Sequence, residues 1–123
     1  MAERLLISVV DDDASIRESI PDLLKELGYS VQAFASAEEF LASDKISQTK
    51  CLVLDVAMPG MSGPDLQREL KRRRYDIPIL FMTANVDARL RLRLIAQGAV
   101  DCLVKPFNDI VLLEAIKVAL SGL

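Results

Sequence analysis

The sequence predicts an α/β domain built on a five-stranded parallel sheet with helices on both faces. Short apolar runs alternate five times with segments whose apolar residues recur at helical spacing. The runs are apolar almost throughout, which is typical of strands buried on both faces of a parallel sheet. No Gly-, Ser- or Pro-rich linker and no internal repeat interrupts the series. We therefore expect one domain, spanning residues 1–123.

The five expected strands are the short apolar runs themselves. They cover residues 5–10, 29–34, 51–54, 77–82 and 99–104. The first run stops abruptly at Asp11 and the third stops at Asp55, so each delivers a carboxylate at its carboxyl end. The polar residues 43–50 are expected to be a connection without regular structure.

The expected helices are marked by capping residues and by the glycines or prolines beside them. They cover residues 14–27, 37–42, 64–74, 86–97 and 109–120. Gly28 suits the position just after the first helix. Ser36 and Glu39 form a capping box for the second helix, Pro64 opens the third, and Asn108 caps the last.

The segment over residues 86–97 carries two competing patterns, and in the first of them residues 90–94 alternate Leu and Arg with strand period. A second pattern is a stripe at helical spacing, formed by Ala88, Leu92, Ile95 and Ala96. Asp87 near the start of the segment and Gly98 just after its end favour a helix with that stripe toward the core. The residues left off the stripe are Arg89, Leu90, Arg91, Arg93 and Leu94. They predict a helix face that meets a partner.

Charge and hydropathy argue against several classes of function. The chain has 15 Lys and Arg against 18 Asp and Glu, a net charge of −3, so it has no overall basic field for nucleic acid. The basic run 68–74 is read as a solvated helix end. No apolar stretch approaches the roughly 20 residues that cross a bilayer, and no signal peptide is evident. We expect a cytoplasmic domain without membrane or direct nucleic-acid contact.

Polar side chains follow four of the expected strands. They are Asp11, Asp12, Asp55, Thr83 and Lys105. The carboxyl ends of parallel strands meet at one edge of a sheet, so these groups should converge. Three carboxylates would repel one another unless a cation neutralised them. With no His and two isolated Cys, the donors are oxygen atoms, which suit Mg²⁺.

The same groups suit phosphoryl transfer. A carboxylate beside Mg²⁺ can act as a nucleophile towards phosphorus, and Asp55 fits that role. An ammonium and a hydroxyl aimed at the same point would neutralise and orient the oxygens of the transferring group. Lys105 and Thr83 fit those two roles.

A series of motifs resembles, in order along the whole chain, the receiver domain of two-component response regulators. They are VVDD at 9–12, LVLD at 52–55 with MPGMSG at 58–63, FMTA at 81–84, and GAVD at 98–101 leading to KPF at 105–107. The segment SAEEFL at 36–41 and the GAVD motif are similar to receivers that precede a LuxR-like helix-turn-helix.

The resemblance implies a flavodoxin-like fold with strand order 2-1-3-4-5. It implies that Asp55 accepts phosphate from a phosphohistidine on a sensor histidine kinase, that Thr83 follows the phosphoryl group and that Lys105 pairs with it. The implied Mg²⁺ ligands are Asp12, Asp55 and the main-chain carbonyl of Ala57, with Asp11 reaching the ion through water. A cis peptide bond between Lys105 and Pro106 is also implied.

The resemblance also concerns output. In receivers the fourth helix, the fifth strand and the fifth helix form a common output and dimer surface. Cys102 departs from the family, which usually has Tyr or Phe three residues before the lysine. In the family, the aromatic ring turns inward when the threonine moves, and the small thiol of Cys102 cannot make an equivalent movement. We therefore expect signalling to rely on Thr83 and on displacement of the loop and helix that follow it.

Other interpretations of the same residues are weaker. Asp11 and Asp12 could cap a helix and Asp55 could be a turn residue, but neither explains their register with Lys105. A Mg²⁺-dependent phosphohydrolase with an aspartate nucleophile would need a second acid two residues after that nucleophile, but residue 57 is Ala57. A receiver that only binds partners usually lacks one of these polar residues, and none is missing here. A free-standing regulator and a piece of a longer DNA-binding protein both fit the sequence.

Overall fold

The computed structural model describes residues 4–85 and 87–121. One parallel sheet has the strand order β2-β1-β3-β4-β5. The strands are β1 (Leu6–Val10), β2 (Ser30–Phe34), β3 (Thr49–Asp55), β4 (Ile79–Thr83) and β5 (Asp101–Val104). The helices are α1 (Ala14–Glu26), α2 (Ala37–Ala42), α3 (Gly63–Arg72), α4 (Ala88–Ala96) and α5 (Asp109–Ser121). The predicted fold class and strand order are confirmed.

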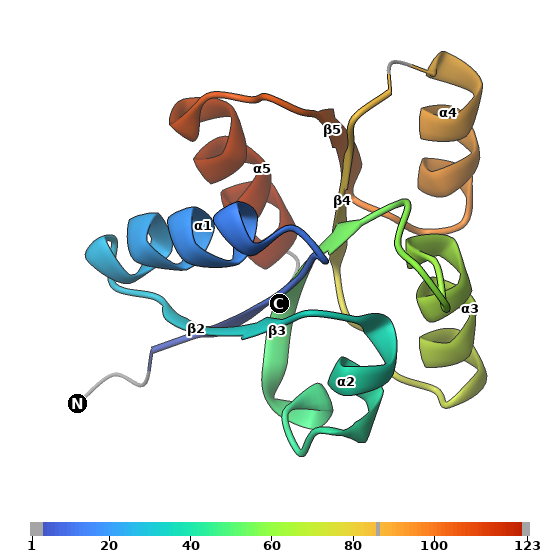
Figure 1. Ribbon diagram of the computed structural model, residues 1–123, viewed down its shortest axis with the longest axis horizontal. Helices are drawn as coiled ribbons and strands as arrows, with labels where there is room; N and C mark the ends of the chain where they lie inside the picture. Colours follow the sequence, from blue (N-terminus) through green and yellow to red (C-terminus); the bar gives the residue numbers. More distant parts are fainter. Residues whose placement is uncertain (1–3, 86, 122–123) are drawn as a thin grey trace.

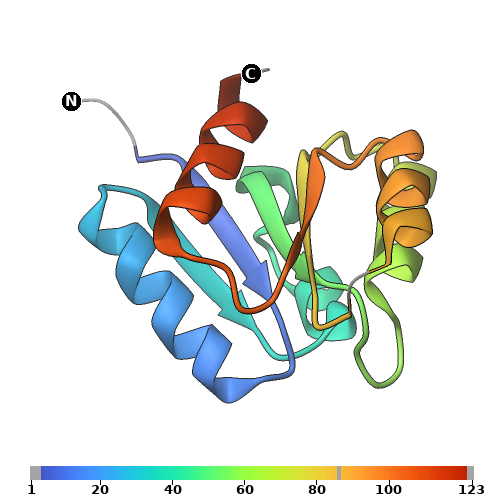
Figure 2. The same cartoon turned by 90° about the horizontal axis from the view of Figure 1, so that it is seen from above.

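Helices cover both faces of the sheet, with α1 and α5 on one side and α2, α3 and α4 on the other (Figures 1 and 2). The core has two apolar layers, one on each face of the sheet, and alternate residues of β3 belong to each. Cys51 and Val53 pack with α1 and α5, and Leu52 and Leu54 pack with the other three helices. Burial on both faces explains why the strands are apolar throughout. Among the described residues, no helix is long and apolar enough to cross a membrane.

The strand register brings the polar ends together. Val10 of β1 lies beside Leu54 of β3, so Asp11 and Asp55 follow adjacent positions. Asp55 in turn lies beside Met82 of β4, one residue before Thr83. The site is therefore a consequence of parallel pairing between three neighbouring strands.

The residues predicted as an irregular connection, 43–50, contain more structure than expected. A short 3₁₀ helix covers Ile46–Gln48, and β3 begins at Thr49 rather than at Cys51. The polar Thr49 can enter the strand because its hydroxyl lies 2.7 Å from the hydroxyl oxygen of Ser8 and donates to the carbonyl of Lys45. A buried hydroxyl with such partners is tolerated inside a sheet.

Capping follows the prediction in part. The Ser36 hydroxyl accepts the Glu39 N–H at 3.0 Å, but the Glu39 carboxylate accepts from Ala35 N–H rather than from Ser36. A reciprocal capping box occurs instead at Ser62 and Asp65, at the start of α3. That helix therefore begins before Pro64.

The rotation of α4 is the reverse of the prediction. Leu94 is buried and Leu90 packs, half-buried, against the core. The residues of the stripe predicted to face the core are all exposed: Ala88, Leu92, Ile95 and Ala96. The assignment of Leu90 and Leu94 to a partner-binding face is therefore wrong, although the three arginines between and beside them are exposed.

Contacts of α4 with β5 account for this rotation. Both apolar stripes satisfy helical spacing, so spacing alone does not choose between them. The helix is capped by Asp87, and the Ala99 N–H donates to the Leu94 carbonyl at 3.0 Å just before β5. The short connection to β5 and the ion pair between Arg91 and Asp101 of β5 hold the side of the helix that carries Leu90 and Leu94 toward the sheet. Val86, which the prediction placed in this helix, lies outside the described residues.

Candidate functional site

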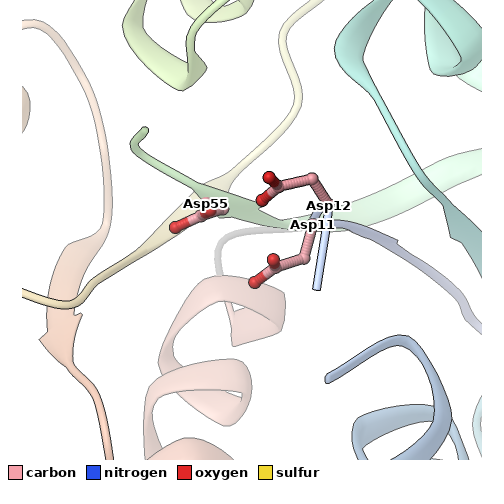
Figure 3. Close-up of side chains that lie close together, drawn as sticks. All are labelled: Asp11, Asp12 and Asp55. Carbon is pink, nitrogen blue, oxygen red and sulfur yellow. The ribbon is translucent and has the colours of Figure 1, made fainter. Parts of the chain in front are cut away.

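Three carboxylates meet at the carboxyl edge of the sheet (Figure 3). Asp11 and Asp12 follow β1, and Asp55 is the last residue of β3. One carboxylate oxygen of each lies within 4.8 Å of those of the other two. Asp11 and Asp55 are buried, whereas Asp12 is exposed. The structure thus brings together the three acids that the sequence placed at strand ends.

Lys105 follows β5 and neutralises part of this charge. Its Nζ atom donates to Asp11 Oδ2 at 2.7 Å and to Asp55 Oδ1 at 3.4 Å. Burial alone would lower the pKa of Lys105, but the two carboxylates outweigh burial and raise that pKa. Lys105 is therefore an ammonium at neutral pH, and with all three acids ionised the four groups carry a net charge of −2.

The excess of negative charge in the site affects the pKa of Asp55. Burial and, next, the negative charge of Asp11 raise the pKa of Asp55 to about 6, although Lys105 acts in the opposite direction. A carboxylate held in this way is costly to ionise unless a cation is added. The site therefore favours uptake of positive charge.

The donor set fits Mg²⁺. Carboxylate oxygens from Asp11, Asp12 and Asp55 converge, and Mg²⁺ prefers oxygen ligands, typically one or two carboxylates with several waters. Ala57, whose main-chain carbonyl was predicted as a further ligand, lies two residues after Asp55 in the loop to α3. The residues present are thus those expected of a hard, divalent cation site.

Mg²⁺ binding is expected to weaken as the pH falls. Asp55 must lose its proton to act as an anionic ligand, and its pKa is about 6, so the apparent affinity should drop about tenfold between pH 7 and pH 5. Calorimetric titration of Mg²⁺ at both pH values measures this. Asp55→Asn should bind Mg²⁺ more weakly than wild type and should lack this tenfold drop in affinity. Equal wild-type affinities at pH 7 and pH 5 would contradict the raised pKa of Asp55.

The loop after β3 is held so that Asp55 faces the site. The Val56 N–H donates to the Met82 carbonyl, and the Gly63 N–H donates to the Val56 carbonyl, both at 2.9 Å. A Cβ atom on Gly63 would clash with the main-chain oxygen of Asp55. Only glycine lets the start of α3 approach β3 this closely.

Thr83 completes the edge from β4. Its side-chain oxygen accepts the Asn85 N–H at 3.2 Å, and its main-chain carbonyl accepts the Lys105 N–H at 2.7 Å. The second bond ties the end of β4 to the lysine. The Lys105–Pro106 peptide bond is cis, as the resemblance implied.

Cys102 is buried on β5, beside Phe81 of β4. A cavity of about 210 Å³ opens beside it; the residues that line it are Thr83, Asn85, Asp87, Ala88, Arg91, Cys102 and Val104. Asp101 Oδ1 accepts from both the Cys102 N–H, at 2.7 Å, and Arg91 Nε, at 2.9 Å. The ion pair between Arg91 and Asp101 therefore joins α4 to β5 next to this cavity.

Two supporting residues were missed at the sequence level. Arg17, on α1, donates from Nη1 to the main-chain carbonyl of Asp11 at 2.9 Å and so helps to fix the first acid. Gly63 belongs to the MPGMSG motif, but the motif alone does not predict its close contact with Asp55. A lone Arg on a helix carries no pattern that would reveal such a contact, whereas a Gly directly before a helix-starting Pro hints at one.

Residues 7–117 match the family model described as the response regulator receiver domain. The chain belongs to this family. Nodulation protein W of Bradyrhizobium diazoefficiens is 46% identical over 116 residues, covering 94% of this receiver and 51% of the relative. Transcriptional regulatory protein FixJ of Azorhizobium caulinodans is 38% identical over 121 residues, covering 98% and 57%. The solved structure of response regulator StyR is 42% identical, with a TM-score of 0.90, over 98% of this receiver and 61% of that chain.

These likenesses confirm the resemblance read from the motifs. The chain is a receiver domain of a two-component system, and its named relatives are regulators rather than metabolic enzymes. It spans about half the length of the curated relatives it matches.

Proposed function

We propose that this receiver is a phosphorylation-controlled switch whose phosphoacceptor is Asp55. The observation that carries the proposal is the position of Asp55: its carboxylate lies within 4.8 Å of two other acids and 3.4 Å from the Lys105 ammonium. In the transfer, an Asp55 oxygen attacks phosphorus while the P–N bond of a phosphohistidine on a sensor histidine kinase breaks. The bonding electron pair leaves with the imidazole nitrogen.

Each neighbour has a role in this reaction. Asp12, Asp55 and the carbonyl of Ala57 would bind Mg²⁺ directly, with Asp11 acting through water. When bound, the ion supplies positive charge that offsets repulsion between the acids and the phosphoryl oxygens. Lys105 already bridges Asp11 and Asp55, so a modest shift lets it pair with a phosphoryl oxygen. The Thr83 hydroxyl would donate to another.

The receiver acts catalytically only on itself. Water attack on the phosphoryl group of Asp55 would return the carboxylate and inorganic phosphate. A dedicated phosphohydrolase would need a second acid to activate that water, and the side chain two residues after Asp55 is the methyl group of Ala57. The site therefore favours a lasting modification over rapid turnover.

Output is proposed to use the surface formed by α4, β5 and α5. Its exposed apolar residues are Leu92, Ile95, Val104, Ile110, Val111 and Val118. We call these six residues the apolar output surface. Exposed apolar residues gathered near one edge of a sheet are typical of an interaction site. With Cys102 in place of an aromatic ring, movement of Thr83 would reach this surface through the β4–α4 loop and the Arg91–Asp101 pair.

The wider setting follows from the relatives. FixJ is named a transcriptional regulatory protein, and such relatives are about twice as long as this receiver. We infer that residues 1–123 form the receiver unit of a cytoplasmic transcription regulator. A LuxR-type helix-turn-helix, rather than this segment, would contact DNA.

Phosphorylation should strengthen self-association of the receiver by about tenfold, in the usual range for coupling between two sites. Sedimentation of the protein with Mg²⁺ and acetyl phosphate measures this, and Asp55→Asn should not respond. Ile110→Asp, at a residue 71% exposed, should still gain phosphate but not associate. Leu27→Asp, at a residue 50% exposed outside the output surface, is the matched control and should behave as wild type. At about 1 M salt, where contacts between charged surfaces are screened, association of equal strength with and without phosphate, or association that survives Ile110→Asp, would contradict the proposal.

A further inference from the structure

The charges of this receiver are separated along the sheet. Residues 63–97 carry eight Lys and Arg against four Asp and Glu, a net charge of +4. Residues 11–44 carry two Lys and Arg against nine Asp and Glu, a net charge of −7. In Figure 1, α1 lies toward the β2 edge of the sheet and α4 toward the β5 edge, so the two helices occupy opposite ends of the molecule.

One face of α1 carries a row of carboxylates. Glu18, Asp22 and Glu26 are spaced four residues apart, so they lie on the same side of the helix. All three are exposed, and none forms an ion pair with another described residue. Like charges at this spacing destabilise a helix, and Glu26 also lies at the unfavourable carboxyl end. Contacts within the described chain do not compensate this acidic row.

A matching row of arginines lies on α4. Arg89 and Arg93 are four residues apart, exposed, and without a carboxylate partner in the part of the chain that the structure describes. Arg91, by contrast, points to β5, where it pairs with Asp101. The Arg89 and Arg93 side chains together form what we call the arginine row.

The position of the arginine row follows from contacts one turn further along. The main-chain carbonyl of Gln97 accepts hydrogen bonds from Gln67, at 3.4 Å, and from Lys71, both on α3. Arg93 lies one turn before Gln97 and Arg89 one turn before Arg93, so the row runs along the α3 side of α4. Lys71 adds positive charge there. The row is thus on the flank away from β5.

We propose that the acidic row on α1 of one copy docks against the arginine row on α4 of a second copy. Four residues of helix rise about 6 Å, so the two rows have equal spacing and two arginines can face two carboxylates. The contact joins different surfaces and is therefore heterologous. It goes beyond the proposed switch: it uses neither the phosphoacceptor nor any of the six residues of the apolar output surface, and it would precede phosphorylation.

The expected behaviour follows from the nature of the contact. Exposed ion pairs are individually weak and are screened by salt, so association should appear at high protein concentration and low ionic strength. At about 10 mM salt the screening length is about 30 Å, against about 3 Å at 1 M. The oppositely charged ends would also orient two approaching copies.

Sedimentation equilibrium of the metal-free receiver, without a phosphodonor, tests the contact. We expect self-association at about 10 mM salt that is lost at about 1 M. The double variant Arg89→Glu/Arg93→Glu should abolish it, and so should Glu18→Arg/Asp22→Arg. An equimolar mixture of the two variants should associate again, because each row then finds an opposite one. Lys45→Glu/Lys50→Glu changes the net charge as much as the arginine variant and should leave association within about twofold of wild type.

Three results would overturn the proposal. They are monomers throughout at low salt, equal loss in the lysine control, and a mixture that fails to associate. A DNA duplex of about 20 base pairs serves as a competing probe: if it binds through Arg89 and Arg93 while copies do not associate, the occupant of the row is nucleic acid. Because no phosphodonor is present, these outcomes are independent of whether Asp55 accepts phosphate.

Discussion

Replacement of Lys105 with methionine is expected to lower the free energy of unfolding by about 3 kcal/mol in the absence of divalent cations. The ammonium lies 2.7 Å from a carboxylate oxygen of Asp11, whose side chain is fully buried. Methionine has a similar length and no charge, so it would leave Asp11 and Asp55 without a counter-charge. Urea unfolding of both proteins in EDTA measures the change.

Saturating Mg²⁺ should shrink this loss, because a divalent cation at the three acids would supply the missing positive charge. Lys25→Met, at an exposed lysine on α1, is the matched control and should shift stability by less than about 0.5 kcal/mol. If Lys105→Met lowered the free energy of unfolding by less than about 1 kcal/mol in EDTA, the claim that the Asp11–Lys105 pair stabilises the fold would be contradicted.

Two leucines on α4 should respond very differently to truncation. Leu94 is 1% exposed within the core, so Leu94→Ala should cost about 3 kcal/mol, in the range for buried leucines. Leu92, two residues away, is 68% exposed, so Leu92→Ala should cost less than about 0.5 kcal/mol. Thermal or urea unfolding measures both losses of stability. A larger loss for Leu92→Ala than for Leu94→Ala would contradict the observed rotation of α4 and support the one that the sequence pattern favoured.

The sheet could be predicted from the sequence because its strands are buried on both faces. Such strands appear as short apolar runs, and residues 51–54 and 77–82 identified two of them within two residues at each end. The α4 rotation could not be predicted in the same way. Either stripe of α4 satisfies helical spacing, and tertiary contacts of the helix with β5 decide between them.

The three acids of the site could also be predicted from the sequence, whereas two of the contacts that support them could not. Carboxylates at the ends of parallel strands must approach one another, so Asp11, Asp12 and Asp55 could be placed together from their positions alone. The contact between Arg17 and the Asp11 carbonyl depends on how α1 packs, and the close approach of Gly63 to Asp55 depends on the path of a loop. Neither is encoded in a local pattern of residues.

The central claim, that Asp55 accepts the phosphoryl group, is tested most directly by the intact mass of the receiver after incubation with Mg²⁺ and acetyl phosphate. We expect a single phosphoryl adduct that requires Mg²⁺ and is absent from Asp55→Asn. An adduct that persists in Asp55→Asn, or wild-type protein that stays unmodified while Mg²⁺ is bound, would contradict the assignment of Asp55 as the phosphoacceptor.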